Sequence, residues 1–488
     1  MSRRRVRTGM RAILGVVALS LLLLAGMPTA GGTGSPSGNP QQDALIRRQG
    51  RWFVDTRGRV VDMRGVNFVQ KFPPIAPEAV GFGDDDAAFL AREGFNLVRL
   101  GVVFGSVMPQ PGAIDDAYVA AIARTTHVLA RHHIYVLLDF HQDGYGPLVH
   151  GNGFPEWATL TDGLPNPDVG FPGYYISNPA LQRAFDNFWN NAKGPDGVRL
   201  QQHYGEALRS VASAVAAEPY VLGYDLMNEP WPGTDWSSCV TGCPGIERAR
   251  LLPFEKRMSD AIRSVDRKHL LFSEPFVLFN FGRTDTVVPA AGTRGGALSF
   301  HVYAASPADE PGVVLHALAA GLARNAPLLA SEYGATTDPA TITRIASTIE
   351  TGLIPWAFWS YDENFVIDKA LPPTADNVRQ LVLDALARPY AAATDGTPTT
   401  WAYDPATGEL HFSYSTTRIA PNHTTHNRDT EIAIGTRAYP GGYRVDVTGG
   451  HVVSAPCASR IRIHNDRNAK VVTVHVERAP CQPAAHAG

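Results

Sequence analysis

Cysteine is scarce in this sequence, with 4 residues in 488. The four fall into two pairs that are close in the chain, Cys239 with Cys243 and Cys457 with Cys481. No histidine lies at ligand spacing near either pair, which argues against a metal site built on these thiols. We therefore expect two local disulfides, as in an exported protein, and no metal.

An excess of charge of either sign is also missing, because 43 Lys and Arg residues face 46 Asp and Glu residues. Residues 1–30 hold five arginines and no acidic residue, so the rest of the chain has 38 basic and 46 acidic residues and a net charge of −8. A chain of this charge lacks the basic surface that binding to nucleic acid or to an anionic membrane requires. We predict neither as a partner.

Long apolar runs are missing apart from Ala12–Met27, which follows the arginines and precedes the small residues Ala30 and Gly31. That order is typical of a secretory signal peptide. The run has 16 residues and is shorter than the roughly 20 needed to cross a bilayer. We predict a signal peptide over 1–30 and secretion of the rest of the chain. An uncleaved membrane anchor is the alternative.

The remaining chain has a globular composition, 44% hydrophobic and 18% charged, and its pattern divides it into regions. Residues 31–50 are small and polar, which predicts a flexible lead-in. From 51 to 387, short apolar segments alternate with amphipathic helical segments such as 115–131 and 200–217. The eight predicted strands are Val60–Phe68, Asn96–Phe104, Ile134–His141, Val221–Glu229, His269–Pro275, Ala297–Tyr303, Pro327–Glu332 and Ile354–Trp359.

Strands that are apolar throughout and are each followed by a helix indicate a parallel sheet covered on both faces. Eight such units predict an α/β fold, a (β/α)8 TIM barrel over 51–387. An open doubly wound sheet is the alternative, although no Gly-rich phosphate turn follows the first strand. Residues 388–488 lose the helical period and alternate in short runs such as 409–415 and 471–476, which predicts a C-terminal β-sandwich domain.

Polar residues gather at the predicted carboxyl ends of these strands. In a barrel of this type those ends surround one mouth, where the chemistry is done. A single polar residue at a strand end is usually a satisfied structural residue, but six strands that share the feature indicate an active site. The residues are Arg99, Asp139, His141, Asp143, Asn228, Glu229, His301, Tyr303, Glu332 and Trp359.

Two of these residues are glutamates, Glu229 on the fourth predicted strand and Glu332 on the seventh. Glycoside hydrolysis needs such a pair, one carboxyl protonated to release the leaving oxygen and one ionised to attack the anomeric carbon. Hydrogen bonds from Tyr303 and Arg99 would keep Glu332 charged. The amide of Asn228 suits a sugar 2-hydroxyl. We predict that Glu229 donates the proton and that Glu332 attacks.

The order of the polar residues along the chain resembles the pattern of glycoside hydrolase family 5. The residues that carry the resemblance are Arg99, His141, Asn228, Glu229, Pro230, His301, Tyr303, Glu332 and Trp359. Within that family the chain is most similar to the endoglycoceramidases, through RGVNFVQK (64–71), LLDFHQDGYG (137–146) and RAFDNFWNN (183–191). The resemblance implies retention of anomeric configuration, with Glu229 as acid/base, Glu332 as nucleophile and carboxyl groups about 5–5.5 Å apart. The residues expected to bind substrate are Lys71, Arg99, His141, Asp143, Asn228, His301, Tyr303 and Trp359.

The resemblance further implies that the bond cut joins the glycan to ceramide in glycosphingolipids, with no metal or organic cofactor. Loops that border the mouth, 142–150 and 276–285, depart from the broad-specificity members, and we expect a preference for galactose linked to ceramide. We also expect a monomer that makes transient contact with a membrane or micelle surface. Candidates for an apolar landing area are Phe104, Val107, Met108, Phe276, Val277, Leu278, Phe279 and Phe281.

Two other functions fit the same residues less well. A β-glucosidase or endo-glucanase with the same catalytic pair would act on β-glucosides that carry no ceramide. A glycan-binding protein with an inactive barrel would not need both glutamates and their neighbours.

Overall fold

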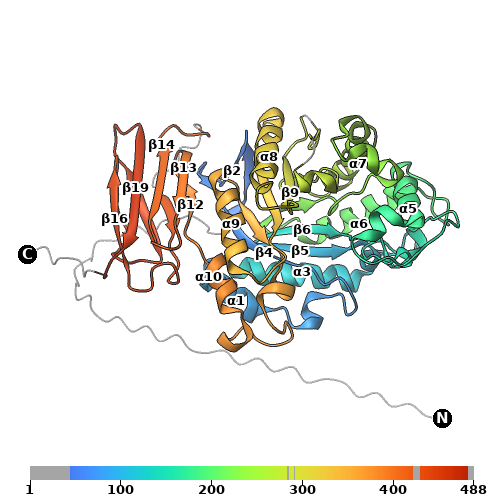
Figure 1. Cartoon of the computed structure of the whole chain (residues 1–488), viewed down its shortest axis with the longest axis horizontal. Helices are drawn as coiled ribbons and strands as arrows, with labels where there is room; N and C mark the ends of the chain where they lie inside the picture. Colours follow the sequence, from blue (N-terminus) through green and yellow to red (C-terminus); the bar gives the residue numbers. More distant parts are fainter. Residues whose placement is uncertain (1–43, 283–284, 291, 421–428, 482–488) are drawn as a thin grey trace, which may run out of the picture. The chain divides into compact units, whose positions relative to one another are not determined.

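The computed structural model describes residues 44–282, 285–290, 292–420 and 429–481. The predicted signal peptide (1–30) and residues 31–43 of the predicted lead-in lie outside these ranges. Eight parallel strands, β4 to β11, close into a barrel, which confirms the predicted TIM barrel (Figure 1). These strands are β4 (Arg64–Phe68), β5 (Leu97–Val103), β6 (Tyr135–His141), β7 (Val221–Asp225), β8 (Leu270–Ser273), β9 (Gly296–Val302), β10 (Leu328–Tyr333) and β11 (Trp356–Phe358).

The barrel strands are buried on both faces, as their apolar sequences require. Every residue of β5 and β7, for example, is buried, since the inner face fills the barrel and the outer face packs on helices. The predicted helices at 115–131 and 200–217 are present as α3 and α6. The helices are α1 (Asp84–Arg92), α2 (Phe104–Val107), α3 (Asp116–Arg131), α4 (Gly173–Ser177), α5 (Pro179–Trp189), α6 (Leu200–Val215), α7 (Pro244–Arg263), α8 (Glu310–Arg324), α9 (Pro339–Thr351) and α10 (Gln380–Leu386).

An N-terminal hairpin covers the amino ends of the barrel strands. Its strands are β1 (Arg47–Gln49) and β2 (Trp52–Val54), and Arg47 pairs with Val54. The predicted flexible lead-in is therefore wrong for residues 47–49. The reason is that Ile46 and Phe53 are buried in one cluster with residues at the strand starts, which are Leu97, Leu137, Leu222, Leu270, Ala297, Leu329 and Ala357.

The hairpin also belongs to a sheet of the C-terminal region. The sheet order is β1-β2-β3-β12-β15-β18-β17, in which β3 alone of the hairpin region pairs with a strand beyond residue 387. The segment before β4 therefore belongs to this sheet and not to the barrel, which was predicted to begin at residue 51. Val60 of β3 pairs with Thr394 of β12. The strands not yet given are β3 (Val60–Val61), β12 (Tyr390–Thr394), β15 (Thr430–Ala433), β17 (Gly450–Val452) and β18 (Arg460–Asn465).

A second, four-stranded sheet completes the predicted β-sandwich, which is confirmed. Its order is β13 (Thr397–Tyr403), β14 (Leu410–Ser415), β19 (Val471–Arg478) and β16 (Tyr443–Thr448). Alternate residues of β14 and β19 are buried against the first sheet, and the residues between them face outward. This period-two pattern is what a sheet with one covered face requires.

The four cysteines form the two expected local pairs. The Cys239 and Cys243 sulfurs lie 2.06 Å apart in the loop between β7 and α7. Cys457 and Cys481 lie at an S–S distance of 2.33 Å in the C-terminal region. Among the residues that the structure describes, no helix is both long enough and apolar enough to cross a membrane.

Candidate active site

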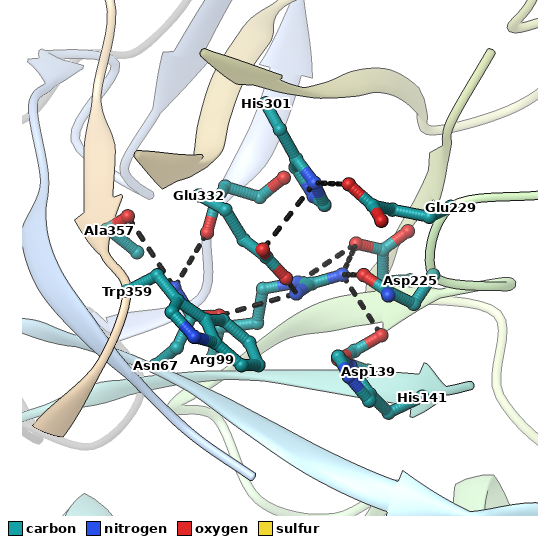
Figure 2. Close-up of polar contacts among 12 residues, drawn as sticks. Asn67, Arg99, Asp139, His141, Asp225, Glu229, His301, Glu332, Ala357 and Trp359 are labelled. Carbon is teal, nitrogen blue, oxygen red and sulfur yellow. Dashed lines mark hydrogen bonds and ion pairs between the residues drawn. The ribbon is translucent and has the colours of Figure 1, made fainter. Parts of the chain in front are cut away.

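The two predicted glutamates converge at the mouth of the barrel. Glu332 lies in β10, whereas Glu229 lies four residues beyond the end of β7, which is shorter than predicted. One carboxylate oxygen of each glutamate and one ring nitrogen of His301 all lie within 4.8 Å of one another. Figure 2 shows His301 in contact with both carboxyl groups. At this spacing one carboxylate can reach a sugar carbon while the other reaches its leaving oxygen.

Glu332 is buried and surrounded by hydrogen-bond donors. Its Oε1 accepts from Arg99 Nη1 at 2.6 Å, and its Oε2 accepts from the Tyr303 hydroxyl at 3.1 Å. Both predicted hydrogen bonds are thus present. Burial raises the pKa of Glu332 to about 7, while His301 and Arg99 oppose that rise and the nearby Glu229 adds to it. The site therefore retains a proton close to neutral pH, and the donors around Glu332 favour its charged form.

Glu229 is held in a left-handed backbone conformation, with φ at +41°. A non-glycine residue pays roughly 1–3 kcal/mol for such a conformation, so its surroundings must fix it. Its N–H donates to Glu274 Oε2, and its carbonyl accepts from Gln142 Nε2, both at 2.9 Å. Its Oε1 accepts from His301 Nδ1 at 2.7 Å and from Asn280 Nδ2 at 3.3 Å. These contacts hold one carboxylate oxygen and leave Oε2 available to carry a proton.

Arg99 and His301 have no exposed side-chain surface. Both side chains contact the catalytic carboxylates directly, and their contact with substrate stays a prediction. Four carboxylates surround the Arg99 guanidinium and, against the effect of burial, hold its pKa well above the usual range. They are Asp139 at 3.0 Å, Asp225 at 3.0 Å, Glu274 at 2.9 Å and Glu332 at 2.6 Å. Figure 2 shows Asp139, Asp225 and Glu332 around Arg99.

His301 connects the two sides of the site. Its Nδ1 faces Glu229 at 2.7 Å and Glu332 at 3.5 Å, and its Nε2 lies 3.2 Å from Glu274. Burial lowers the pKa of His301, but Glu274 and Glu332 outweigh it and hold the pKa well above its ordinary value. A protonated His301 can therefore donate to Glu229 and fix its Oε1.

Sequence reasoning missed Glu274, which lies directly after β8. Its carboxylate faces Arg99 and His301 and accepts the backbone N–H of Glu229. Burial raises its pKa, but His301 and Arg99 lower it further, to about 2. A signal was present in the sequence, because Glu274–Pro275 follows an apolar strand just as Glu229–Pro230 does.

Four of the predicted sugar-binding residues form one group beside the carboxylates. The Lys71 amine lies 2.9 Å from Asp143 and 4.4 Å from the centre of the Trp359 ring. His141 stacks on Trp359 with ring centres 5.4 Å apart, and its two nitrogens face Asp139 at 2.7 Å and Asp143 at 3.2 Å. Burial opposes the charge on His141, but Asp139 and Asp143 raise its pKa to about 9.

Asn228 is also at the site but is already engaged. Its Oδ1 accepts from Arg99 at 2.9 Å, and its Nδ2 donates to the Gln142 carbonyl at 3.0 Å. An amide nitrogen carries two hydrogens, so one remains for the predicted sugar hydroxyl. Tyr303 likewise stays beside Glu332, as its hydrogen bond requires.

The predicted apolar landing area is wrong for most of its residues. Phe104, Val107, Met108, Phe276, Val277 and Phe279 are buried in the core, since the segment after β8 turns inward and Phe276 packs on Trp189. Several apolar side chains that are exposed, Phe281 of the predicted set among them, lie in the segments that follow barrel strands. They are Phe72 (62% exposed), Leu148 (42%), Phe171 (70%), Ile176 (50%), Phe281 (39%), Ile367 (58%) and Leu371 (55%).

Comparison with family models agrees with this architecture. A model described as cellulase (glycosyl hydrolase family 5) matches residues 54–365. A second model, described as glycoside hydrolase family 5 C-terminal domain, matches residues 388–476.

Comparison with individual proteins finds similar enzymes. The chain is 33% identical over 459 residues to endoglycoceramidase I of Rhodococcus hoagii (strain 103S), which covers 89% of this chain and 88% of the relative. It is 29% identical over 318 residues to the endoglycoceramidase of Hydra vulgaris and spans 59% of that protein's length. Endo-glycoceramidase II from Rhodococcus sp. in complex with ganglioside GM3 superposes with a TM-score of 0.70 at 28% identity, over 88% of this chain and 99% of that one. An endogalactoceramidase structure, at 24% identity and a TM-score of 0.66 over 89% of this chain and 100% of that one, shares the fold.

Proposed function

The chain belongs to glycosyl hydrolase family 5, and from that membership we propose that it cleaves the β-glycosidic bond between oligosaccharide and ceramide in glycosphingolipids. Relatives named as endoglycoceramidases support this substrate class. So does the ganglioside complex of a similar enzyme. An endo-acting enzyme of this kind releases the oligosaccharide intact.

One observation carries the proposed mechanism, the convergence of Glu229 and Glu332 within 4.8 Å in unlike surroundings. Glu332, whose two oxygens accept hydrogen bonds, attacks the anomeric carbon while Glu229 protonates the departing ceramide oxygen. A glycosyl ester on Glu332 results. Glu229 then removes a proton from water, the water oxygen attacks the same carbon, and Glu332 leaves. Two inversions give net retention.

The group formed by Lys71, His141, Asp143 and Trp359 holds the sugar next to ceramide in this proposal. The Lys71–Asp143 pair is partly exposed and offers a cationic donor and an anionic acceptor side by side. Sugar hydroxyls both donate and accept, so they can bind both members of the pair. Trp359 offers an apolar ring beside them.

Product analysis tests the substrate class directly. The enzyme is incubated with a fluorescent ganglioside and, separately, with a soluble β-glucan, and products are separated by chromatography. We expect free ceramide and an intact oligosaccharide from the ganglioside. Cleavage of the glucan alone would contradict the proposed cleavage at ceramide and favour an endo-glucanase. A Glu332→Gln control distinguishes enzyme from contaminant.

We further propose a preference for galactose as the ceramide-linked sugar. The support is the divergent loop 142–150, which begins directly after His141 and contains Asp143. Galactose and glucose differ in the direction of one ring hydroxyl, so a pocket edge of different shape can separate them. Matched lipids that carry glucose or galactose on the same ceramide give the test. Faster cleavage of the glucose-linked lipid would contradict only this preference.

Contact with a lipid surface forms part of the proposal, through the exposed apolar residues of the strand-following loops. These loops belong to the mouth side of the barrel, where a lipid tail would emerge. Phe171→Ser should slow hydrolysis of glycolipid in vesicles about 5-fold and leave a soluble aryl glycoside unaffected. Leu315→Ser is the matched control, because Leu315 is 62% exposed on helix α8, outside these loops. Equal effects of the two variants would contradict the contact.

We also propose that the chain is secreted and acts as a monomer. The basic, apolar and small-residue order of 1–30 and the two disulfides support export. All the groups named in the mechanism come from a single chain, which supports a monomer. The amino-terminal sequence of protein recovered from culture medium and its sedimentation velocity test these two points.

A further inference from the structure

A second convergence of donor atoms lies far along the chain from the catalytic residues, on the outward face of the four-stranded sheet. His411 of β14 and His475 of β19 are paired directly across the two strands. Their rings stack with centres 4.6 Å apart and planes 14° apart. Glu409, two residues before His411, brings its Oε2 to 3.6 Å from His411 Nε2. One donor atom from each of the three residues lies within 4.8 Å of the other two.

The backbone that carries these donors is rigid. β14 and β19 are the two inner strands of the order β13-β14-β19-β16, so each is hydrogen-bonded on both sides. The side chains are free to adjust, since those of His411 and Glu409 are 60% and 53% exposed. Zn²⁺ binds histidine nitrogen and carboxylate oxygen at about 2.0–2.2 Å, which small rotations of these side chains would allow. Asp446 of β16 is paired with His475 on the same face, but its Oδ2 accepts from Arg444 at 3.3 Å, so it would have to leave Arg444 to become a fourth ligand.

The sandwich also contains a histidine pair that lacks these properties. His451 of β17 and His464 of β18 are paired across strands, but their ring planes are 50° apart. Each ring already faces its own carboxylate, His451 with Asp466 at 3.1 Å and His464 with Asp429 at 3.2 Å. A cross-strand histidine pair alone therefore does not create the arrangement seen at His411.

We propose that Glu409, His411 and His475 bind one Zn²⁺ ion per chain. A borderline divalent cation fits this donor set, because two imidazoles and one carboxylate suit zinc better than the oxygen-seeking Mg²⁺ or Ca²⁺. The ion joins the two central strands of the sheet and stabilises the folded C-terminal domain by binding only to it. It takes no part in hydrolysis, since the catalytic carboxylates lie at the barrel mouth.

Calorimetric titration of the chelator-treated full-length protein with ZnCl₂ tests the site. We expect one saturable ion per chain, and a rise of about 3 °C in the unfolding midpoint at 100 times the Kd. His475→Ala should abolish both effects, whereas His464→Ala should abolish neither. Glu409→Gln gives a second variant that keeps the histidine stacking and should weaken binding at least 5-fold.

Three results would overturn the proposal. They are the absence of saturable binding, equal loss of binding in His475→Ala and His464→Ala, and loss of binding in Glu229→Gln. The last would place the ion at Glu229, His301 and Glu332, the other group of described residues whose donor atoms converge. MgCl₂ in place of ZnCl₂ should give no binding at the same concentrations.

Discussion

The two ends of the barrel differ in the side chains that they bury, apolar at one end and ionisable at the other. At the amino ends, Leu97, Leu222 and Leu270 pack with Ile46 and Phe53 of the hairpin, all of them buried. Towards the carboxyl ends of the barrel strands lie buried ionisable groups, which begin at Arg99 in the middle of β5 and include Asp139, Asp225, Glu274, His301 and Glu332. Burying charge costs stability unless every group is paired. The apolar amino end therefore stabilises the fold, and this stability offsets the cost of burying the catalytic ionisable groups at the carboxyl end.

The largest expected effect comes from Glu332→Gln. We expect kcat to fall at least 10⁴-fold, about 5.5 kcal/mol of transition-state stabilisation, because the amide cannot attack the sugar carbon. Since the pKa of Glu332 is raised to about 7, its ionised form weakens the fold above that pH. The variant should then unfold at an equal or higher temperature than wild type at pH 8. Retained turnover would remove Glu332 as the nucleophile.

Glu274→Gln should give the next largest effect. It leaves Arg99, His301 and the Glu229 N–H with a weaker acceptor, so we expect kcat to fall about 10²–10³-fold with little change in KM. The pKa of Glu274 is lowered to about 2, so its contribution to stability is present above pH 4.5 and is lost as the pH falls towards 2. Kinetics and thermal unfolding at pH 7 measure both effects.

Glu255→Gln is the matched control for Glu274→Gln. Glu255 is also a buried carboxylate, but it lies on α7 and accepts the N–H of Ala290. Its replacement should leave kcat within about 2-fold of wild type. Equal kinetic losses in the two variants would show that Glu274 acts only through the stability of the fold.

Leu222→Ala tests the opposite end of a catalytic strand. Leu222 is fully buried on β7, the strand that leads to Glu229. Deleting its side chain should lower the free energy of unfolding by about 3 kcal/mol. Below the unfolding transition kcat should be unchanged. A fall in kcat comparable to that of Glu274→Gln would contradict the view that the amino end affects only stability.

The smallest expected effect is a pH dependence from His141. Its pKa is raised from 6.5 to about 9, so its contribution to stability is complete below pH 6.5 and disappears as the pH rises through 9. We expect wild type to lose about 2 kcal/mol more than His141→Asn over this interval. Denaturant unfolding at pH 6.5 and pH 9.5 gives the comparison, and parallel curves for the two proteins would contradict it.

The sequence was sufficient for the barrel, since eight apolar strands and their helices carry strong periodic signals. The convergence of Glu229 and Glu332 followed from their places at strand ends. Glu274 was missed although its strand was predicted as His269–Pro275, because its partners Arg99 and His301 lie on other strands and no local pattern shows that the three meet. Which ionisable side chains become buried, such as Arg99, depends on packing from all sides and is not encoded in any local stretch.

Two other differences come from long-range contacts. The hairpin at 47–54 has few apolar residues, and what holds it is the docking of Ile46 and Phe53 on strand starts distant in the chain. The segment after β8 is rich in aromatic residues, but it is irregular, so no period indicates which side chains turn inward. An apolar run at a barrel mouth can equally face lipid or core.

The seven-stranded sheet combines strands that are synthesised early with strands that are synthesised late. β3 emerges from the ribosome early, yet its neighbour β12 follows about 330 residues later. β12 in turn pairs with β15, and β15 pairs with β18. The sheet that includes the hairpin at the amino ends of the barrel strands can therefore form completely only when synthesis is almost over. A protein cut short at residue 387 would present the bare edge of β3 to other molecules and be prone to aggregate.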